Sequence, residues 1–230
     1  MMTRLRLQQQ LLTAVQGESS GESPASKLSV TRFSAHSAKL PQPTVLVSRT
    51  LEIVMVMHFK IIAAGPKATG KTVICNFLSN HNDKLDPPES YCPTAGVRIL
   101  EFQPSVPGIN EEVITVELWD MSGDQMYESC WKAIMQEADG VILVYNPDAP
   151  AQDQQISDWF EYFVRRNGLR DEQCIVLAHR GSVEGKAGKF RPPPLFSRVT
   201  AAMTTTQSSD EIRSMFENFL KEIHTMKRRK

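Results

Sequence analysis

Between residue 57 and the C-terminus, apolar residues recur in short blocks whose spacing alternates between that of a strand and that of a helix. Five blocks have the length and apolar content of strands: Phe59–Ala64, Val97–Phe102, Val113–Trp119, Gly140–Tyr145 and Cys174–Ala178. The second and third can pair as a hairpin, whereas the last two are continuous apolar runs typical of buried parallel strands. The alternation therefore predicts an α/β fold, with helices on both faces of a mostly parallel sheet.

Helical spacing occurs in three places. Val73–Leu78 can form a helix directly after a glycine-rich turn, and a second helix is indicated by Ile156, Trp159, Phe160 and Phe163. Near the C-terminus, Ser208 and Glu211 have the spacing of a capping box. Behind them runs one apolar stripe: Ile212, Met215, Phe216, Phe219, Leu220, Ile223 and Met226. We interpret both apolar patterns as core packing, and a partner surface is the alternative for the stripe.

The first predicted strand and the first predicted helix are joined by Gly65-Pro66-Lys67-Ala68-Thr69-Gly70-Lys71-Thr72, which matches the phosphate-binding pattern G-x-x-x-x-G-K-[ST]. In such a loop, glycines let the backbone close around a triphosphate while successive N–H groups point at its oxygens. Lys71 would bring a cation to the outer phosphates, and the Thr72 hydroxyl would coordinate magnesium. We expect nucleotide contacts from these residues: Gly65, Lys67, Ala68, Thr69, Gly70, Lys71, Thr72 and Val73. An ordinary glycine-rich turn with a surface lysine is the alternative.

Charge and cysteine content narrow the classes of function. The 26 Lys and Arg residues balance the 26 Asp and Glu residues, which argues against a dedicated nucleic-acid-binding protein. The four cysteines have no C-x-x-C spacing, so neither a zinc site nor a disulfide framework is indicated, and a reducing compartment is expected. No apolar run approaches the roughly 18 residues needed to cross a bilayer.

The N-terminal quarter of the chain differs from the rest. Residues 1–44 are rich in Gln, Ser, Thr and Ala and have no strand or helix period. We therefore expect residues 1–56 to be a disordered or dispensable extension, followed by one domain over residues 57–230. A mitochondrial targeting segment is the alternative, because the extension contains arginine and serine but few acidic residues.

The order of motifs along residues 57–230 resembles that of the Ras-like small GTPases, and within them it most resembles the Rab-like protein 5 group. The resemblance rests on these segments: Gly65–Thr72, Tyr91–Phe102, Glu117–Asp120, Gly123-Asp124, Glu128–Trp131 and Cys174–His179. It implies the small-GTPase fold, with a six-stranded, mostly parallel sheet and helices on both faces. It also implies that the chain binds GTP or GDP together with Mg2+.

The resemblance assigns further residues to the terminal phosphate and the metal ion. Thr94 resembles the first-switch threonine, whose hydroxyl coordinates Mg2+ and whose amide meets the terminal phosphate. Asp120 resembles the second-switch aspartate, which holds Mg2+ through a water, and Gly123 would donate its N–H to the terminal phosphate. The expected metal ligands are thus Thr72, Thr94 and Asp120. A turn threonine after Pro93 and a strand-end cap are the alternatives for Thr94 and Asp120.

Two residues depart from the pattern of fast-hydrolysing small GTPases. Asp124 stands where a glutamine usually orients the attacking water, and Gln125 lies one residue further on. The shorter, negatively charged side chain would position water poorly and repel a phosphate. Lys67 stands where a small residue is usual. Because positioning carries much of phosphoryl-transfer catalysis, we expect slow or partner-dependent GTP hydrolysis and assign no catalytic residue.

The base-recognition elements also depart from the family pattern. His179-Arg180-Gly181-Ser182 occupies the position of the N/T-K-x-D sequence without its aspartate, and Ala201–Thr204 lies roughly where S-A-K is usual. The missing carboxylate removes the most direct source of guanine selectivity. His179 and Arg180 remain expected nucleotide contacts, Arg180 by stacking on the base. Gly181–Arg198 is expected to be a long surface loop in place of a helix, with a partner contact as the alternative.

The resemblance implies a GTP-binding subunit of the intraflagellar transport B complex, which docks coiled-coil partner subunits in the cytoplasm and in the cilium or flagellum. Candidate contact segments are Thr94–Ile99 and Gly123–Trp131. Because Lys227–Lys230 holds no cysteine and residue 2 is Met, we expect no lipid anchor. We expect neither nucleic acid nor a second copy of the chain as a partner. The alternatives are a regulatory switch that hydrolyses GTP and, from another class, a P-loop ATPase or small-molecule kinase.

Overall fold

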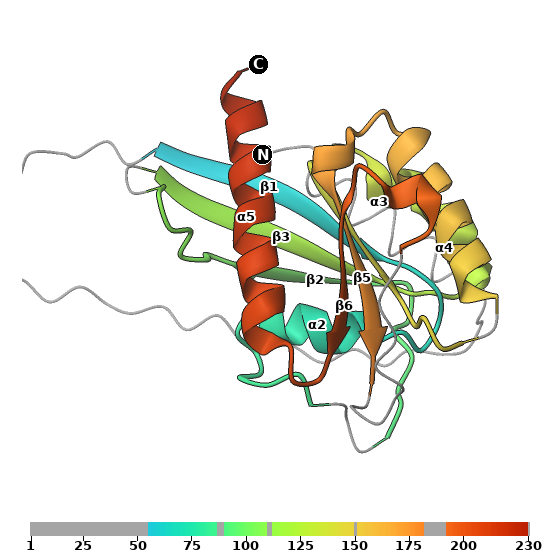
Figure 1. The fold of residues 1–230 in the computed structure, drawn as a ribbon. Coiled ribbons are helices and arrows are strands. Elements are labelled where there is room, and N and C mark those ends of the chain that lie inside the picture. Colours follow the sequence, from blue (N-terminus) through green and yellow to red (C-terminus); the bar gives the residue numbers. More distant parts are fainter. Residues whose placement is uncertain (1–54, 87–89, 110–111, 150, 182–191, 230) are drawn as a thin grey trace, which may run out of the picture. The chain divides into compact units, whose positions relative to one another are not determined.

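The computed structural model describes residues 55–86, 90–109, 112–149, 151–181 and 192–229. Its centre is a six-stranded sheet with the order β2-β3-β1-β4-β5-β6 (Figure 1). The strands are β1 Met55–Ala64, β2 Val97–Phe102, β3 Glu112–Met121, β4 Gly140–Tyr145, β5 Cys174–Arg180 and β6 Thr200–Thr205. Strands β2 and β3 pair antiparallel and all other neighbours pair parallel, which confirms the predicted hairpin and the mostly parallel sheet.

Helices lie on both faces of this sheet (Figure 1). The α-helices in the described ranges are α2 Lys71–Leu78, α3 Glu128–Met135, α4 Gln152–Phe160 and α5 Ser209–Arg228. Short turns of other helix types are η1 Gln125–Tyr127, η2 Glu161–Arg165, η3 Asp171–Gln173 and η4 Pro194–Phe196. Helices α2 and α5 pack on one face, and α3 and α4 cover the other. The predicted α/β class is therefore confirmed.

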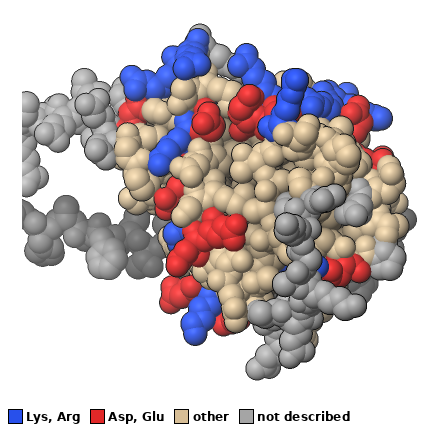
Figure 2. All heavy atoms as spheres, in the orientation of Figure 1, with Lys and Arg blue, Asp and Glu red and all other residues tan. Residues whose placement is uncertain are grey.

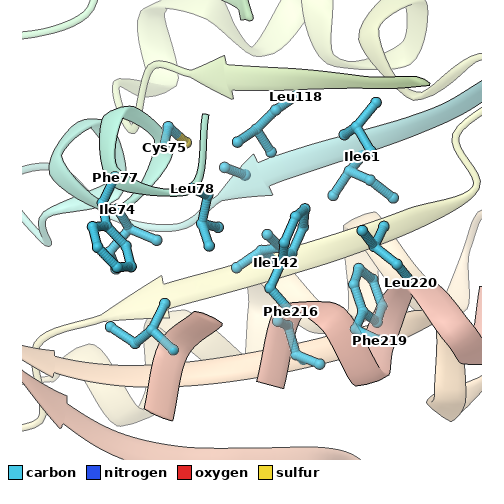
Figure 3. Packing of buried hydrophobic residues seen from close by; sticks show 14 of the residues in the cluster. Ile61, Ile74, Cys75, Phe77, Leu78, Leu118, Ile142, Phe216, Phe219 and Leu220 are labelled. Carbon is cyan, nitrogen blue, oxygen red and sulfur yellow. The ribbon is translucent and has the colours of Figure 1, made fainter. Parts of the chain in front are cut away.

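The apolar stripe of α5 packs against the sheet, as the interpretation of its spacing requires. Its members Ile212, Phe216, Phe219, Leu220 and Ile223 are buried in the core, while Met215 packs at its edge and Met226 is half-buried near the helix end. Figure 3 shows Phe216, Phe219 and Leu220 directed from the helix towards the strands. Phe219 comes so close to β4 that a Cβ at Gly140 would lie 2.6 Å from its Cζ. This contact explains the glycine that opens the strand.

The predicted capping box at the start of α5 is wrong. Ser208 is the N-cap residue, but its side chain makes no bond to the N–H groups of the first helical turn. Its Oγ instead accepts a hydrogen bond from the Thr205 N–H at 3.1 Å. Only three residues separate β6 from α5, so the hydroxyl stabilises this tight connection rather than the helix end.

The opposite face of the sheet holds an aromatic cluster. The ring centroid of Trp131 on α3 lies 4.8 Å from that of Trp159 on α4 and 5.2 Å from that of Phe163. All three side chains are buried, which confirms core packing for this helix. In the described end of the predicted loop 181–198, Phe196 packs on Phe160 with centroids 5.2 Å apart; residues 182–191 of that loop lie outside the described ranges.

The C-terminal end of α5 is fixed to the sheet by charged groups. Lys227 Nζ donates to Asp139 Oδ2 at 2.8 Å and to the His58 carbonyl at 2.7 Å, and His224 Nε2 lies 2.5 Å from Glu112 Oε2. Figure 2 shows basic and acidic side chains beside one another along the top of the molecule as drawn. No helix in the described ranges combines the length and hydrophobicity of a membrane span. Of the predicted N-terminal extension, residues 1–56, residues 1–54 lie outside those ranges, whereas Met55 and Val56 belong to β1 and pair with β3.

Candidate nucleotide-binding site

A cleft of about 840 Å³ opens beyond the carboxyl ends of the parallel strands, where ligands of open α/β sheets usually bind. The predicted nucleotide contacts that line it are Lys67, Ala68, Thr69, Gly70, Lys71, Thr72, Val73, Thr94, Gly123 and His179. Two other predicted contacts, Gly65 and Arg180, do not line it. Sequence reasoning missed Asn146 after β4 and Thr206 after β6, which both do. Their positions at strand ends were the available signal.

The phosphate-binding loop has a backbone that only glycine permits at two positions. Gly65 has φ +139°, and a Cβ there would lie 2.0 Å from the Val144 carbonyl oxygen. Gly70 has φ +88°, and its Cβ would lie 2.7 Å from Cδ2 of His179. L-residues rarely adopt such angles, so both glycines are required by conformation as well as by space. The loop is thereby held between β4 and β5.

Lys71 lies at the start of α2 with its side chain folded under this loop. Its side chain is buried, and Nζ donates to the carbonyl oxygens of Gly65 at 2.9 Å and of Pro66 at 2.6 Å. Burial lowers the pKa of the Lys71 ammonium to about 8. Two carbonyl acceptors thus hold the cation at the loop, beside the cleft that it also lines.

Three oxygen-bearing side chains meet where Mg2+ is expected. The hydroxyls of Thr72 and Thr94 are 2.9 Å apart, although the residues belong to different segments. Asp120 is fully buried at the end of β3, and its Oδ1 makes no well-aligned hydrogen bond to the described residues. Two hydroxyls and a buried carboxylate are the hard oxygen ligands that Mg2+ prefers. The residues present therefore fit this ion.

Arg98 on β2 contacts the same carboxylate and was missed by sequence reasoning. Its Nη2 donates to Asp120 Oδ2 at 3.1 Å and to Asn76 Oδ1 at 2.7 Å. Burial raises the pKa of Asp120, and the Thr72 hydroxyl and the Arg98 guanidinium oppose that shift. The signal lay in the hairpin, because its antiparallel register places Arg98 opposite Asp120.

The second switch segment, residues Gly123–Trp131, lies directly against the phosphate-binding loop at its first residue. A Cβ at Gly123 would lie 2.5 Å from Pro66 C and 2.6 Å from Lys67 N, so only glycine allows this approach. The next residue, Asp124, forms an ion pair with Lys67, whose Nζ lies 2.7 Å from Oδ2. This hydrogen bond from Lys67 lowers the pKa of Asp124. The two departures from the family pattern are thus in contact with each other.

A buried histidine also lines the cleft. His179 is buried, its Nδ1 lies 3.1 Å from Thr204 Oγ1, and burial lowers the pKa of its imidazole. Arg180 turns away from the cleft and pairs with Asp148, with Nη2 2.7 Å from Oδ1. Ala201–Thr204 lies within β6, so the cleft contact from this element comes from Thr206 instead.

Comparison with known proteins places this geometry in a family. Residues 60–181 match the family described as Ras of Complex, Roc, domain of DAPkinase. Intraflagellar transport protein 22 homolog of Homo sapiens is 39% identical over 168 residues, which are 71% of this chain and 89% of that protein. Intraflagellar transport protein 22 of Chlamydomonas reinhardtii is 37% identical over 126 residues, which are 55% of this chain and 64% of that protein.

Solved structures with the same fold include two from T. brucei. The GTP-bound complex of intraflagellar transport proteins 22, 74 and 81 gives a TM-score of 0.60 at 22% identity, covering 74% of this chain and 97% of that one. GDP-bound intraflagellar transport protein 22 gives 0.57 at 23% identity with the same coverage. Because the sequence match to the human protein extends over 89% of its length and the family match over residues 60–181, this chain belongs to the intraflagellar transport protein 22 family of Ras-like GTPase-domain proteins.

Proposed function

We propose that this chain binds GTP and GDP with Mg2+ in the described cleft, and that it serves as a stably loaded subunit rather than a fast hydrolase. The proposal rests on one contrast: the groups that would bind phosphate and metal are present in the cleft, whereas the residue that would orient the attacking water is not. The groups for phosphate and metal are together: Lys71 beside the loop, and the hydroxyls of Thr72 and Thr94 2.9 Å apart near buried Asp120. The position that should orient the attacking water holds Asp124, which is paired with Lys67.

The metal would be held by Thr72, Thr94 and Asp120, and when bound it would neutralise charge on the outer phosphates. Lys71 would contribute a second positive charge from its place under the loop. Asp124 accepts hydrogen bonds from Lys67 and from the Met126 N–H at 3.1 Å. A carboxylate engaged in this way positions a water poorly, which supports slow hydrolysis.

Guanine as the base rests on the nucleotides named with the T. brucei relatives, which are GTP and GDP. The cleft offers His179, Asn146 and Thr206 near the expected base. Burial lowers the pKa of the His179 imidazole, so it would face the base as a neutral group. We propose that these polar groups replace the missing aspartate.

Partner docking is supported by the complex in which the T. brucei relative was solved, with intraflagellar transport proteins 74 and 81. We propose that this chain docks the corresponding coiled-coil subunits, in the cytoplasm and the cilium or flagellum. Within the expected contact segments, Ile99 is 40% and Met126 is 72% exposed, whereas Trp131 is buried against Trp159. Ile99 and Met126 are therefore available for contact, and Trp131 supports the segment from beneath.

The first test is to purify the full chain, denature it and identify the released nucleotide by ion-pair chromatography. Retained GTP supports a stably loaded subunit, and GDP together with rapid conversion of freshly loaded GTP supports the alternative of a hydrolysing switch. ATP in the released fraction would refute guanine binding. The Thr72→Asn variant should lose both nucleotide and binding to the coiled-coil pair, while Ser214→Asn, an exposed substitution outside the cleft and outside both contact segments, should lose neither.

A further inference from the structure

The ion pair between Lys67 and Asp124 joins two segments that both line the nucleotide cleft. Lys67 belongs to the phosphate-binding loop and Asp124 to the second switch segment, and both line the cleft. Their charged atoms are 2.7 Å apart, and the side chains are 59% and 30% exposed. A contact of this length closes the second switch segment onto the loop at the residue after Gly123.

A terminal phosphate would compete for the same cation. The outer phosphate of a triphosphate brings more negative charge than one carboxylate, and an ammonium group prefers the stronger anion at equal distance. The same phosphate repels Asp124, because like charges in one cleft disfavour each other. A diphosphate lacks this outer group and leaves the pair undisturbed.

Asp124 also borders a second hollow. This hollow of about 370 Å³ lies on the other side of the pair, between the second switch segment and α4. Its lining includes Gln152, Gln155 and Asp158 of α4 as well as Lys67 and Asp124. The amide groups of Gln152 and Gln155 can donate hydrogen bonds to a carboxylate, whereas Asp158 would repel it.

We propose that the Lys67–Asp124 ion pair sets the preference of this protein between nucleoside diphosphate and nucleoside triphosphate. With diphosphate bound, the pair holds the second switch segment to the loop. The terminal phosphate of a triphosphate takes Lys67 from Asp124, so triphosphate binding breaks the pair. The proposal rests on the nucleotide binding proposed above and adds how this chain's own residues discriminate between the two nucleotides.

Two models can be told apart by whether Asp124→Asn has its larger effect on nucleotide preference with Lys67 present or with Lys67→Met. If triphosphate breaks the pair, Asp124→Asn relieves the repulsion by the terminal phosphate in both backgrounds, and it relieves the loss of the pair only while Lys67 is present. If Lys67 stays on Asp124, it screens that carboxylate, and Asp124→Asn has its larger effect in the Lys67→Met background. The two cases therefore differ in which background shows the larger effect.

The experiment measures Kd for fluorescent GTP and GDP analogues in Mg2+ buffer with the full chain. The variants are wild type, Lys67→Met, Asp124→Asn and the double variant. We expect Asp124→Asn to raise the preference for triphosphate about twofold to fivefold more in the wild-type background than in the Lys67→Met background, because exposed ion pairs contribute in that range. This excess should disappear in about 0.5 M KCl, since salt screens exposed charges.

Glu128→Gln provides the matched control, because it removes one exposed carboxylate four residues from Asp124 and does not line the cleft. It should leave the preference unchanged. An equal or smaller effect of Asp124→Asn in the wild-type background would overturn the inference while leaving nucleotide binding intact. Failure of wild type to bind either nucleotide would refute the proposed function and this inference together. GDP binding by each variant confirms that it has folded.

Discussion

Replacing Gly123 by alanine tests whether the second switch segment touches the terminal phosphate. The added Cβ would lie 2.5 Å from Pro66 C, 2.6 Å from Lys67 N and 2.7 Å from Gly65 O, whereas ordinary contact begins near 3.4 Å. All three atoms are backbone, so the switch segment must retreat by roughly 0.7–0.9 Å, the difference between those distances. Gly123 does not have a left-handed φ, and the alanine itself adds no backbone strain.

That retreat is enough to break one hydrogen bond. An N–H···O contact of about 2.9 Å becomes one of about 3.7 Å, beyond hydrogen-bond range. A hydrogen bond to a charged acceptor is worth about 1.5–3 kcal/mol, which corresponds to a loss of roughly 10- to 150-fold in affinity. We expect this loss for GTP alone, because GDP has no terminal phosphate for the Gly123 N–H to meet. Titration of fluorescent GTP and GDP analogues with the full chain measures both.

Gly181→Ala is the matched control for this substitution. Gly181 also lines the cleft, but a Cβ there would meet nothing within 4 Å. Its affinities for both nucleotides should stay at the wild-type level. Equal loss of GTP and GDP affinity in Gly123→Ala, or no loss of either, would show that the second switch segment does not contact the terminal phosphate in this protein.

Three further predictions concern groups that the fold buries. Arg98→Met leaves the carboxylate of Asp120 without its guanidinium and should lower the free energy of unfolding by about 1–3 kcal/mol in urea titrations. Leu220→Ala removes a fully buried side chain from α5 and should lower it by about 3–5 kcal/mol, measured in the same way. Burial lowers the pKa of His179 in the folded state, so the unfolded chain binds more protons below its ordinary value of 6.5. Stability attributable to this residue is therefore present above pH 6.5 and is lost as pH falls, by at most about 1.4 kcal/mol per pH unit. Thermal unfolding of wild type and His179→Gln between about pH 7.5 and 5.5, on either side of that ordinary value, should show a steeper loss in wild type.

Each of these has its own control. Arg213→Met removes a half-buried arginine that bonds Asn80 and lies over the Phe77 ring rather than pairing with a carboxylate, and it should change stability by less than about 1 kcal/mol. An equal loss would mean that Asp120 is not what Arg98 stabilises. Met226→Ala, half-buried on the same helix, should have a smaller effect than Leu220→Ala. Parallel pH profiles for wild type and His179→Gln would exclude His179 as the source of the slope.

The elements themselves could be predicted because their signals are local. The phosphate-binding loop carries its glycines and Lys71 within eight residues, and each predicted strand is a continuous apolar or alternating run. The α5 stripe identifies its buried face in the same way, since helical periodicity is a property of neighbouring positions. The predicted capping box of Ser208 and Glu211 was wrong because a contact outside the helix decides the role of Ser208. Ser208 has the right neighbours, but the short connection from β6 uses its hydroxyl.

By itself, then, the sequence determined the order of strands and helices, the phosphate-binding loop and the departures at Lys67 and Asp124 from the family pattern. Only the tertiary structure brought together residues that are distant in the chain. The Lys67–Asp124 pair depends on how the end of β3 meets the loop after β1, and Arg98 reaches Asp120 through the register of a hairpin. Such contacts follow from strand pairing and packing over long separations, which no local pattern of residues encodes.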